Sequence, residues 1–398
     1  MESIRKLLVV GLDVASLAAS AKRAGYEVYS VDYFGDSDLV NSCSLSLSVM
    51  EQREGASCGR LGLDFNMKDL LVLSKKLVER HEVDGILLSS GLEDHPQILS
   101  ALNKLAPIIG NKPGTINRVR NKKLFFAELD RIGVPHPEIE LAESFEEARK
   151  KAQDIGYPVI VKPEKGFGGS GLRRASNPKR LEAILRSTPL GERFLIQEYV
   201  KGKTASTSVI STMEEARTLT MNEQLLGKHS LGQQKPFGYC GNIAPLETPR
   251  PVSDRCKEIS EKVVRHFHLL GSNGVDFVIT KKGLPKIMEV NPRFQGTLEC
   301  VERVLGINIV KVHIEACTLK ILPNLEEARG FCVRLILYAL KRLKVPALDM
   351  FEGIRDVPFE GVIIEKGEPL CSVLKEGRSR TAALQKAGEL ADSIYCSI

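Results

Sequence analysis

The stretch that decides the fold is a pair of apolar runs, Val275-Asp276-Phe277-Val278-Ile279 and Ile287-Met288-Glu289-Val290-Asn291-Pro292-Arg293. Each run has the length and composition of a buried strand, yet each carries one acid inside it. Burying an ionised carboxylate without a partner is costly, so Asp276 and Glu289 are expected to lie together. Because only a short turn through Lys281-Lys282-Gly283 separates the runs, the sequence predicts a hairpin with both acids on one face.

Two further polar residues extend the acidic pair. Asn291 lies two residues beyond Glu289, which places it on the same strand face. Two carboxylates and an amide oxygen suit Mg²⁺, a hard ion that takes oxygen ligands and shares its shell with phosphates. Arg293, two residues further on, would reach phosphoryl oxygens. The alternative is a structural ion pair between Arg293 and the acids. The pattern therefore predicts a metal–phosphate site.

A glycine-rich segment follows an apolar strand that ends at Lys162. It formally contains the spacing of a dinucleotide-binding fingerprint, but that motif requires a helix directly afterwards, and Leu172–Pro178 is a poor helix start. A flexible loop whose bare N–H groups approach phosphates fits better, and Lys162 would point a cation at the same phosphates. The alternative is an ordinary glycine-rich turn. The candidate phosphate-binding residues of this loop are Gly166, Gly168, Gly169, Ser170 and Gly171.

Composition narrows the class of protein. With 43% apolar and 27% charged residues and a net charge of +6, the chain is an ordinary globular one, and it lacks the concentrated basic stripe of a nucleic-acid binder. Its nine cysteines never fall at Cys-x-x-Cys spacing, which argues against a zinc ribbon or a disulfide framework. The apolar run Leu7–Leu12 is too short to span a membrane. We expect a cytoplasmic protein with no membrane or nucleic-acid partner.

The order of predicted elements divides the chain into three parts. Strands at Leu7–Gly11 and Glu27–Val31, with a helix at Ala15–Ala24 between them, begin a βαβ series that predicts a parallel sheet with helices on both faces. Residues 111–118 are interpreted as a domain junction, because Pro and Gly punctuate them. A helix at Ser144–Ile155 begins with a capping box. From about 330, strand-like runs at 331–338, 361–364 and 370–374 precede a final helix at about 381–395.

Six stretches, in order, resemble the ATP-grasp ligases: Asn121-Lys122 with Phe125, Leu129 and Gly133–Pro137; Tyr157–Pro163; Gly166–Gly171; Gln197–Gly202; Val275–Phe277; and Glu289–Arg293. The resemblance implies an α/β and α+β fold. A Rossmann-like domain would span 1–112, and an ATP-grasp domain 113–325, with lobes at about 118–195 and 196–325. A small mixed β/α domain would span 326–398, and within it the stretch from Gly361 to Ile398 is similar to the tail of the biotin carboxylase and glycinamide ribonucleotide synthetase branch. Gly91–Pro96 is similar to a stretch in an archaeal group of the family.

The resemblance also implies roles for individual residues. Lys122 and Lys162 would contact the phosphates of ATP, and Arg293 would stabilise the transferring phosphoryl group. Thr204 stands where relatives usually place a ribose-binding Glu, so ribose would be held differently here. The implied adenine-side residues are Gln197, Glu198, Tyr199 and Val200. The implied ligands of Mg²⁺ (or Mn²⁺) are Asp276, Glu289 and Asn291, and the implied catalytic residues are Arg293, Lys162 and Asn291.

These features predict an ATP-dependent carboxylate–amine ligase that works through an acyl phosphate on small-molecule carboxylate and amine substrates. A homodimer would agree with relatives. Three alternatives stay open. They are a phosphotransferase that stops at an acyl or carbamoyl phosphate, a non-catalytic nucleotide-binding module, and a dinucleotide-dependent oxidoreductase. Asp13 and Asp32, after the first two strands, are candidates for ligand binding, with helix capping as the alternative for Asp13. Glu93 and Asp94 are likewise candidates for ligand binding, with a capping role as the alternative.

Overall fold

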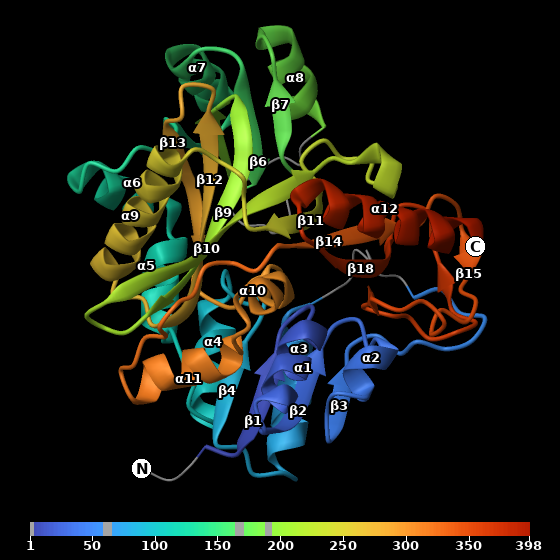
Figure 1. The fold of residues 1–398 in the computed structure, drawn as a ribbon. Coiled ribbons are helices and arrows are strands. Elements are labelled where there is room, and N and C mark those ends of the chain that lie inside the picture. The colour runs from blue at the N-terminus through green and yellow to red at the C-terminus, as the bar shows by residue number, and fades with distance from the viewer. Residues whose placement is uncertain (1–3, 59–65, 164–170, 188–192) are drawn as a thin grey trace.

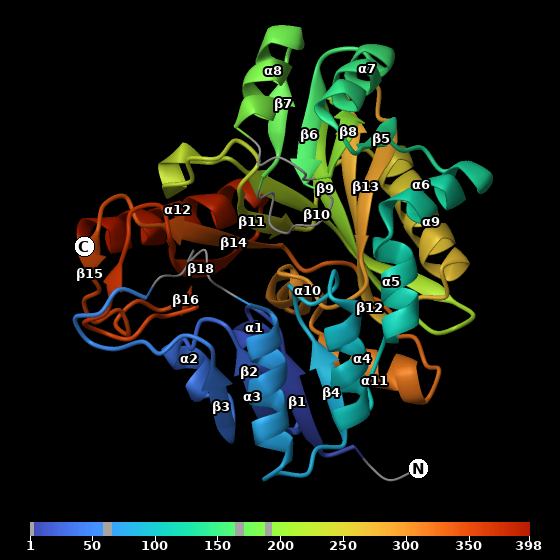
Figure 2. The same cartoon turned by 180° about the vertical axis from the view of Figure 1, so that it is seen from behind.

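The computed structural model describes residues 4–58, 66–163, 171–187 and 193–398. Three substantial sheets and the helices that cover them build the molecule (Figure 1). Figure 2 shows from behind that the N-terminal part lies below the two sheets of the central part, with the C-terminal helix beside them. The predicted combination of a parallel N-terminal sheet with α+β parts is confirmed.

The N-terminal sheet is parallel, with strand order β3-β2-β1-β4. Its strands are β1 (Lys6–Val10), β2 (Glu27–Asp32), β3 (Leu45–Ser48) and β4 (Gly85–Leu88). Side chains alternate along β1, so that Leu7 and Val9 pack with α1 (Ala15–Arg23), whereas Leu8 and Val10 pack with α3 (Lys68–Val78) and α4 (Pro96–Leu105). Helices therefore cover both faces, as predicted.

The largest sheet is antiparallel and has the order β13-β12-β9-β10-β11-β14-β18-β16. Its strands are β9 (Gly202–Ser211), β10 (Ala216–Leu226), β11 (Tyr239–Ala244), β12 (Gly271–Thr280), β13 (Pro285–Asn291), β14 (Phe331–Tyr338), β16 (Ile354–Arg355) and β18 (Pro369–Gly377). This sheet runs across position 325, where the sequence predicts a domain boundary. The proposed boundaries stay predictions.

A smaller antiparallel sheet faces the large one, with the order β5-β8-β6-β7. Its strands are β5 (Ile139–Ala142), β6 (Val159–Pro163), β7 (Arg173–Ala175) and β8 (Phe194–Glu198), and α7 (Phe145–Ile155) and α8 (Pro178–Arg186) pack on it. The Ser144 hydroxyl accepts the Glu147 N–H at 3.1 Å, as the capping box requires. The Glu147 carboxylate accepts the N–H of Glu143 instead of that of Ser144.

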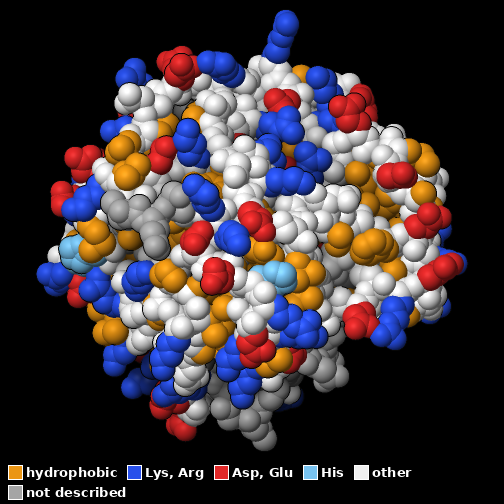
Figure 3. Space-filling model, turned by 90° about the horizontal axis from the view of Figure 1, so that it is seen from below, with side chains coloured by type: hydrophobic (Ala, Val, Ile, Leu, Met, Phe, Trp, Pro, Cys, Tyr) orange, Lys and Arg blue, Asp and Glu red, His pale blue; other side chains and the backbone are white. Residues whose placement is uncertain are grey.

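The remaining elements connect these sheets. They are α2 (Ser37–Val40), α5 (Pro113–Arg120), α6 (Lys122–Arg131), the 3₁₀ turn η1 (His229–Leu231), α9 (Arg250–His266), α10 (Leu298–Leu305), α11 (Ile309–Thr318), β15 (Leu343–Lys344), β17 (Ile363–Ile364) and α12 (Arg380–Cys396). No described helix is both long and apolar enough to cross a membrane. On the face in Figure 3, basic and acidic side chains are interspersed.

The predicted domain junction at 111–118 stays a prediction. Locally these residues are not an irregular linker, because α5 begins at Pro113. Proline is well accommodated at the first helical position, where its missing N–H has no helical acceptor, and Ile116 and Val119 are buried. Asp13 does not cap α1, since Val14 occupies the N-cap without a side-chain hydrogen bond.

Candidate active site

The predicted hairpin is present, and the register of β12 and β13 places its two acids directly opposite each other. Asp276 pairs with Glu289, and a bulge follows between Asp276 and Phe277. Asn291 donates its Nδ2–H to Asp276 Oδ2 at 3.0 Å. Gln224, on β10, donates to the other oxygen of Asp276 at 2.9 Å. The acids are therefore neighbours on one strand face, each fixed by polar side chains.

The two acids differ in their electrostatic surroundings. Burial, and next the negative charge of Glu289, raise the pKa of Asp276 to about 7. Burial also acts to raise the pKa of Glu289, but the cations of Lys122 and Arg120 outweigh it and hold that pKa well below its usual range. The pair thus contains one firmly ionised carboxylate and one whose ionisation is opposed by its neighbour. A cation placed between them would favour the ionised form of both.

Three basic side chains approach Glu289 and its surroundings. Lys122 Nζ lies 3.1 Å from Glu289 Oε2, and an Arg120 terminal nitrogen lies 3.4 Å from the same oxygen. Lys162, on β6 of the smaller sheet, donates to Gln197 Oε1 at 2.6 Å. Burial, and next the charge of Lys122, lower the pKa of Lys162 to about 7. These cations have little solvation of their own, which suits them to an anionic ligand.

Arg293 makes an ion pair that the sequence did not indicate. Its Nε contacts the carboxylate of Glu93, which follows β4 of the N-terminal sheet. Its terminal nitrogens donate to the Phe294 carbonyl at 2.8 Å and to Asn291 Oδ1 at 3.3 Å. The alternative expectation, an ion pair with Asp276 or Glu289, is not found among the described residues. Arg293 instead links the N-terminal sheet to the acidic hairpin.

The predicted adenine-side residues lie at the end of β8 and just beyond it. The Glu198 N–H already donates to the Glu138 carbonyl at 2.8 Å, and its carboxylate accepts two hydrogen bonds from Lys286, at 2.7 and 2.9 Å. The Tyr199 N–H donates to Pro158, and the Arg174 guanidinium lies 4.3 Å from the Tyr199 ring centre. Val200 follows directly and is half-buried.

Thr204 does not present a free hydroxyl, because its Oγ1 donates to the Gln224 carbonyl at 2.9 Å. A carboxylate does lie nearby. Glu223, on the adjoining strand, pairs with Lys203 at 3.1 Å and with Arg380 at 2.8 Å. Both oxygens of Glu223 are thus engaged, and a ribose role for Thr204 stays a prediction.

Four residues of the predicted phosphate loop, Gly166, Gly168, Gly169 and Ser170, lie outside the described residues. Gly171 is described, with a φ of +77° that favours glycine. An open groove of about 1000 Å³ is lined by Lys122, Glu198 and Lys286 among others. Lys162, Asp276 and Arg293 do not line it, so it is a neighbour of the candidate site and not its centre.

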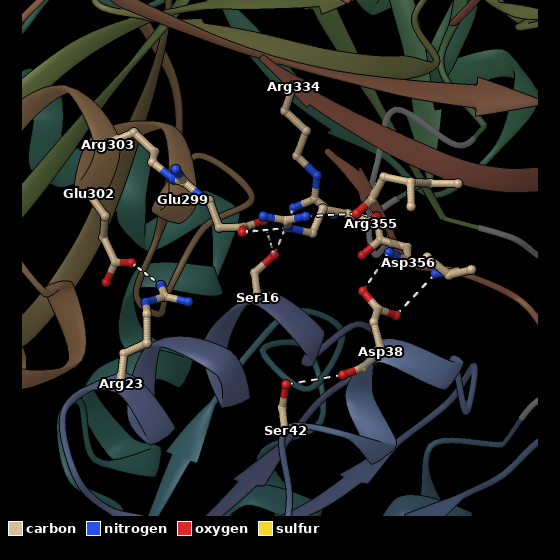
Figure 4. A network of polar contacts seen from close by, with 12 residues as sticks. Ser16, Arg23, Asp38, Ser42, Glu299, Glu302, Arg303, Arg334, Arg355 and Asp356 are labelled. Carbon is tan, nitrogen blue, oxygen red and sulfur yellow. Dashed lines mark hydrogen bonds and ion pairs between the residues drawn. The ribbon is translucent and has the colours of Figure 1, made fainter. Parts of the chain in front are cut away.

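A second polar network joins the N-terminal sheet to the rest of the molecule (Figure 4). Arg334, buried on β14, pairs with Asp356 at 2.5 Å and Asp13 at 3.5 Å, and it donates to Ser16 at 3.2 Å. Ser16 in turn donates to Glu299 at 3.0 Å. Asp32 accepts the N–H groups of its own turn, those of Phe34 and Gly35. In the structure, both predicted strand-end aspartates therefore have protein partners.

Sequence reasoning assigned no site role to two residues that contact the candidate site, Arg120 and Gln224, and it left the role of a third, Glu93, open. Arg120 lies two residues before Lys122, and this basic spacing was the available signal. Glu93 belongs to the Gly91–Pro96 motif, but nothing in the sequence indicates its partner. Gln224 was given no role, since β10 itself was not predicted.

Residues 119–297, which hold the hairpin, both lysines and the smaller sheet, match the family model of the ATP-grasp domain. The chain contains an ATP-grasp domain. It is 28% identical over 369 residues to an uncharacterized protein of Methanocaldococcus jannaschii, covering 93% of this chain and 88% of that one. It is also 27% identical over 241 residues to the arginine-specific large chain of carbamoyl phosphate synthase from Bacillus subtilis, covering 59% of this chain and only 22% of that one.

Solved structures show the same fold. A biotin carboxylase from Campylobacter jejuni superposes with a TM-score of 0.73 and 18% identity, covering 96% of this chain and 90% of that one. The likeness therefore extends beyond the ATP-grasp domain to the N-terminal parallel sheet and the C-terminal strands. At this identity it establishes the fold and leaves the reaction open.

Proposed function

We propose that this protein is an ATP-dependent carboxylate–amine ligase, which forms an amide-type bond on a small molecule or amino acid and releases ADP and phosphate. The observation that carries the proposal is a convergence of charges around one strand pair. Asp276 and Glu289 face each other, Lys122 contacts Glu289, and Arg293 contacts Asn291. The match of residues 119–297 to the ATP-grasp domain model supports ATP as the nucleotide.

The proposed reaction has two steps. A carboxylate oxygen of the substrate attacks the γ-phosphorus of ATP, and the bond from that phosphorus to the β–γ bridging oxygen breaks, so ADP leaves. An amine nitrogen then attacks the carbonyl carbon of the acyl phosphate, the carbon–oxygen bond to phosphate breaks, and the nitrogen loses a proton. Lys122, Lys162 and Arg293 would neutralise charge on the phosphoryl oxygens, where positioning and electrostatics supply most of the rate.

The acidic hairpin fits a divalent cation. Asp276, Glu289 and the amide oxygen of Asn291 are hard oxygen donors of the type that Mg²⁺ or Mn²⁺ prefers, and the raised pKa of Asp276 reflects its burial and the negative charge of Glu289. Among the described residues, no three His, Cys, Asp or Glu side chains are placed so that together they could hold a metal ion, so phosphate oxygens and water would complete the shell. When bound, the ion would polarise the phosphates and offset their charge.

A second candidate function is a phosphotransferase that makes an acyl or carbamoyl phosphate. It is favoured by the similarity over 241 residues to the large chain of a carbamoyl phosphate synthase. Both functions would use the same ATP-binding residues. They differ in the fate of the phosphoryl group: the ligase releases it as phosphate when the amine attacks, whereas the phosphotransferase retains it in the product.

The test is a screen of ADP and phosphate release with pairs of carboxylates and amines, including amino acids and bicarbonate. The ligase predicts a pair that gives ADP and phosphate together, with an amide product by mass. ADP release that needs no amine, with the phosphoryl group retained in an acyl phosphate, would favour the phosphotransferase. Nucleotide binding without turnover of any pair would favour the non-catalytic module.

Substitution of Glu289 tests the site itself. Glu289→Gln removes the ionised carboxylate opposite Asp276 but keeps its shape, so turnover should fall on the order of 10²-fold. Glu302→Gln is the matched control, because Glu302 is buried and ion-paired away from the hairpin, with Arg23. Equal turnover in wild type and Glu289→Gln would contradict the proposal.

A further inference from the structure

The turn that follows β4 reaches from the N-terminal sheet into the candidate site. Glu93 pairs with Arg293, and Asp94 binds Arg120 through two hydrogen bonds, of 2.7 and 2.9 Å. Arg120 in turn contacts Glu289. Two consecutive acids of one turn thus each hold an arginine that adjoins the acidic hairpin, although Glu93 and Arg293 are 200 residues apart in sequence.

The carboxylate of Glu93 is itself rigidly placed. Its residue is 8% exposed, and its Oε2 accepts the Gly91 N–H at 2.6 Å. Gly91 adopts a φ of +104°, and a Cβ at this position would lie 2.5 Å from a Leu12 side-chain carbon. The turn therefore has little freedom to move. The carboxylate that Arg293 contacts, that of Glu93, is fixed by the backbone N–H of Gly91 in the same turn.

The hydrogen bonds of Arg293 show which edge of the guanidinium is held. A guanidinium carries five N–H groups. Its Nε–H goes to Glu93, and one hydrogen on each terminal nitrogen goes to the Phe294 carbonyl and to Asn291 Oδ1. Each terminal nitrogen keeps one hydrogen with no partner among the described residues. Glu93 thus holds the Nε edge and leaves the opposite end available to an anion.

We propose that Glu93 is a positioning residue: it fixes the guanidinium of Arg293 so that its terminal N–H groups face the transferring phosphoryl group. This inference rests on the proposed function, which places that group at Arg293. Asp94 holds Arg120 against Glu289 in the same way. The N-terminal sheet is then part of the phosphoryl-transfer site, in addition to any part it has in binding substrates.

The competing explanation is that Glu93 is only a counter-charge to a buried arginine. The two ideas make opposite predictions for an anion that binds at Arg293. A mere counter-charge competes with the anion, so neutralising Glu93 would tighten anion binding. A positioning residue pre-orients the donor, so loss of its geometry would weaken anion binding whether or not its charge is kept.

Inorganic phosphate, titrated onto the full-length protein saturated with MgADP, is a suitable probe because it needs no knowledge of the substrates. Glu93→Gln removes the charge and keeps the length of the side chain. Glu93→Asp keeps the charge but withdraws the carboxylate by one methylene. The matched control is Glu302→Gln. Glu302 is also 8% exposed, and it also accepts a backbone N–H, that of Ile309 at 2.8 Å. Like the pair of Glu93 and Arg293, Glu302 and its partner Arg23 join the N-terminal part of the chain to the rest of the molecule (Figure 4).

We expect both Glu93 variants to weaken phosphate binding about tenfold or more while the Kd for MgADP changes less than twofold. Glu302→Gln should change neither, and its thermal midpoint shows how much of any effect is loss of stability. Phosphate binding that is unchanged or tighter in Glu93→Gln would overturn the inference, as would wild-type protein that binds MgADP but no phosphate. Failure of wild type to bind MgADP at all would instead reject the proposed function.

Discussion

Lys162 offers the sharpest test of how the candidate site binds nucleotide. Its ammonium is buried beside Lys122, and these surroundings lower its pKa to about 7. At pH 8 the free protein therefore holds Lys162 mostly as the neutral amine. Phosphate oxygens nearby favour the charged form. Nucleotide binding at pH 8 should accordingly draw a proton from solution onto Lys162.

The magnitude follows from the pKa. At one pH unit above its pKa, a lysine is roughly 90% neutral, so binding should take up about 0.9 proton at pH 8. Because only the charged form is competent, affinity should fall roughly tenfold for each pH unit above 7, until the pKa of the complex is reached. A terminal phosphate, with a second pKa of about 6, is already ionised at pH 8 and adds little. Asp276, with a pKa of about 7, is also mostly ionised there.

The assay is calorimetric titration with a non-hydrolysable MgATP analogue at pH 8, in two buffers of different ionisation enthalpy. The difference in observed enthalpy gives the number of protons taken up. Lys162→Arg is the control, since arginine stays charged over this range and should abolish the uptake contributed by this side chain. Wild-type uptake near zero, or an equal uptake in Lys162→Arg, would refute the reasoning.

Further predictions concern the stability of the scaffold. His313 is buried, accepts the Ser272 N–H at Nδ1 at 2.8 Å, and has a pKa lowered by burial to about 4. The unfolded state therefore binds this proton more readily, so stability falls as pH drops from about 6.5 toward 4, by about 2 kcal/mol at pH 5. In denaturant unfolding at pH 6.5 and pH 5, His313→Gln should lose about 2 kcal/mol less unfolding free energy than wild type. An equal loss in the two proteins would contradict this prediction. Gly241→Ala should destabilise by about 3 kcal/mol or more, because φ is +122° and a Cβ would lie 2.0 Å from the Arg334 carbonyl oxygen. Gly388→Ala, in α12 with nothing within 4 Å of an added Cβ, should instead stabilise by roughly 0.5–1 kcal/mol; thermal unfolding of both variants measures the contrast.

The acidic hairpin was predictable because its signal is local. An acid inside an apolar strand is conspicuous, and a short turn limits where the next strand can pair. The register that sets Asp276 against Glu289 follows from those two facts. Arg293 lies two residues beyond Asn291, so its proximity to the hairpin also follows from strand geometry.

Strand β9 was not predictable for the opposite reason. Its residues include Ser206, Thr207, Ser208 and Ser211, which are all buried although the stretch has no apolar alternation. The hydroxyls of Thr207, Ser208 and Ser211 are satisfied by partners distant in sequence, such as Ser260 at 2.8 Å from Thr207. A polar segment is stable in a core only when the fold brings such partners to it, and one sequence does not show which partners will arrive.

The charge balance of the site explains why the turn after β4 belongs to it. Lys122, Lys162, Arg120 and Arg293 are four described basic side chains near the acids of the hairpin, and without counter-ions they would repel one another in a poorly solvated place. The strand acids, Asp276 and Glu289, offset only part of this charge. Glu93 and Asp94 supply the rest, each held against one arginine. Near pH 7, where Lys162 and Asp276 are each about half ionised, these four acidic and four basic groups nearly balance. If ATP binds here as proposed, its own cations would offset the charge that it brings, and Glu93 and Asp94 would then favour a metal-complexed nucleotide over a free one.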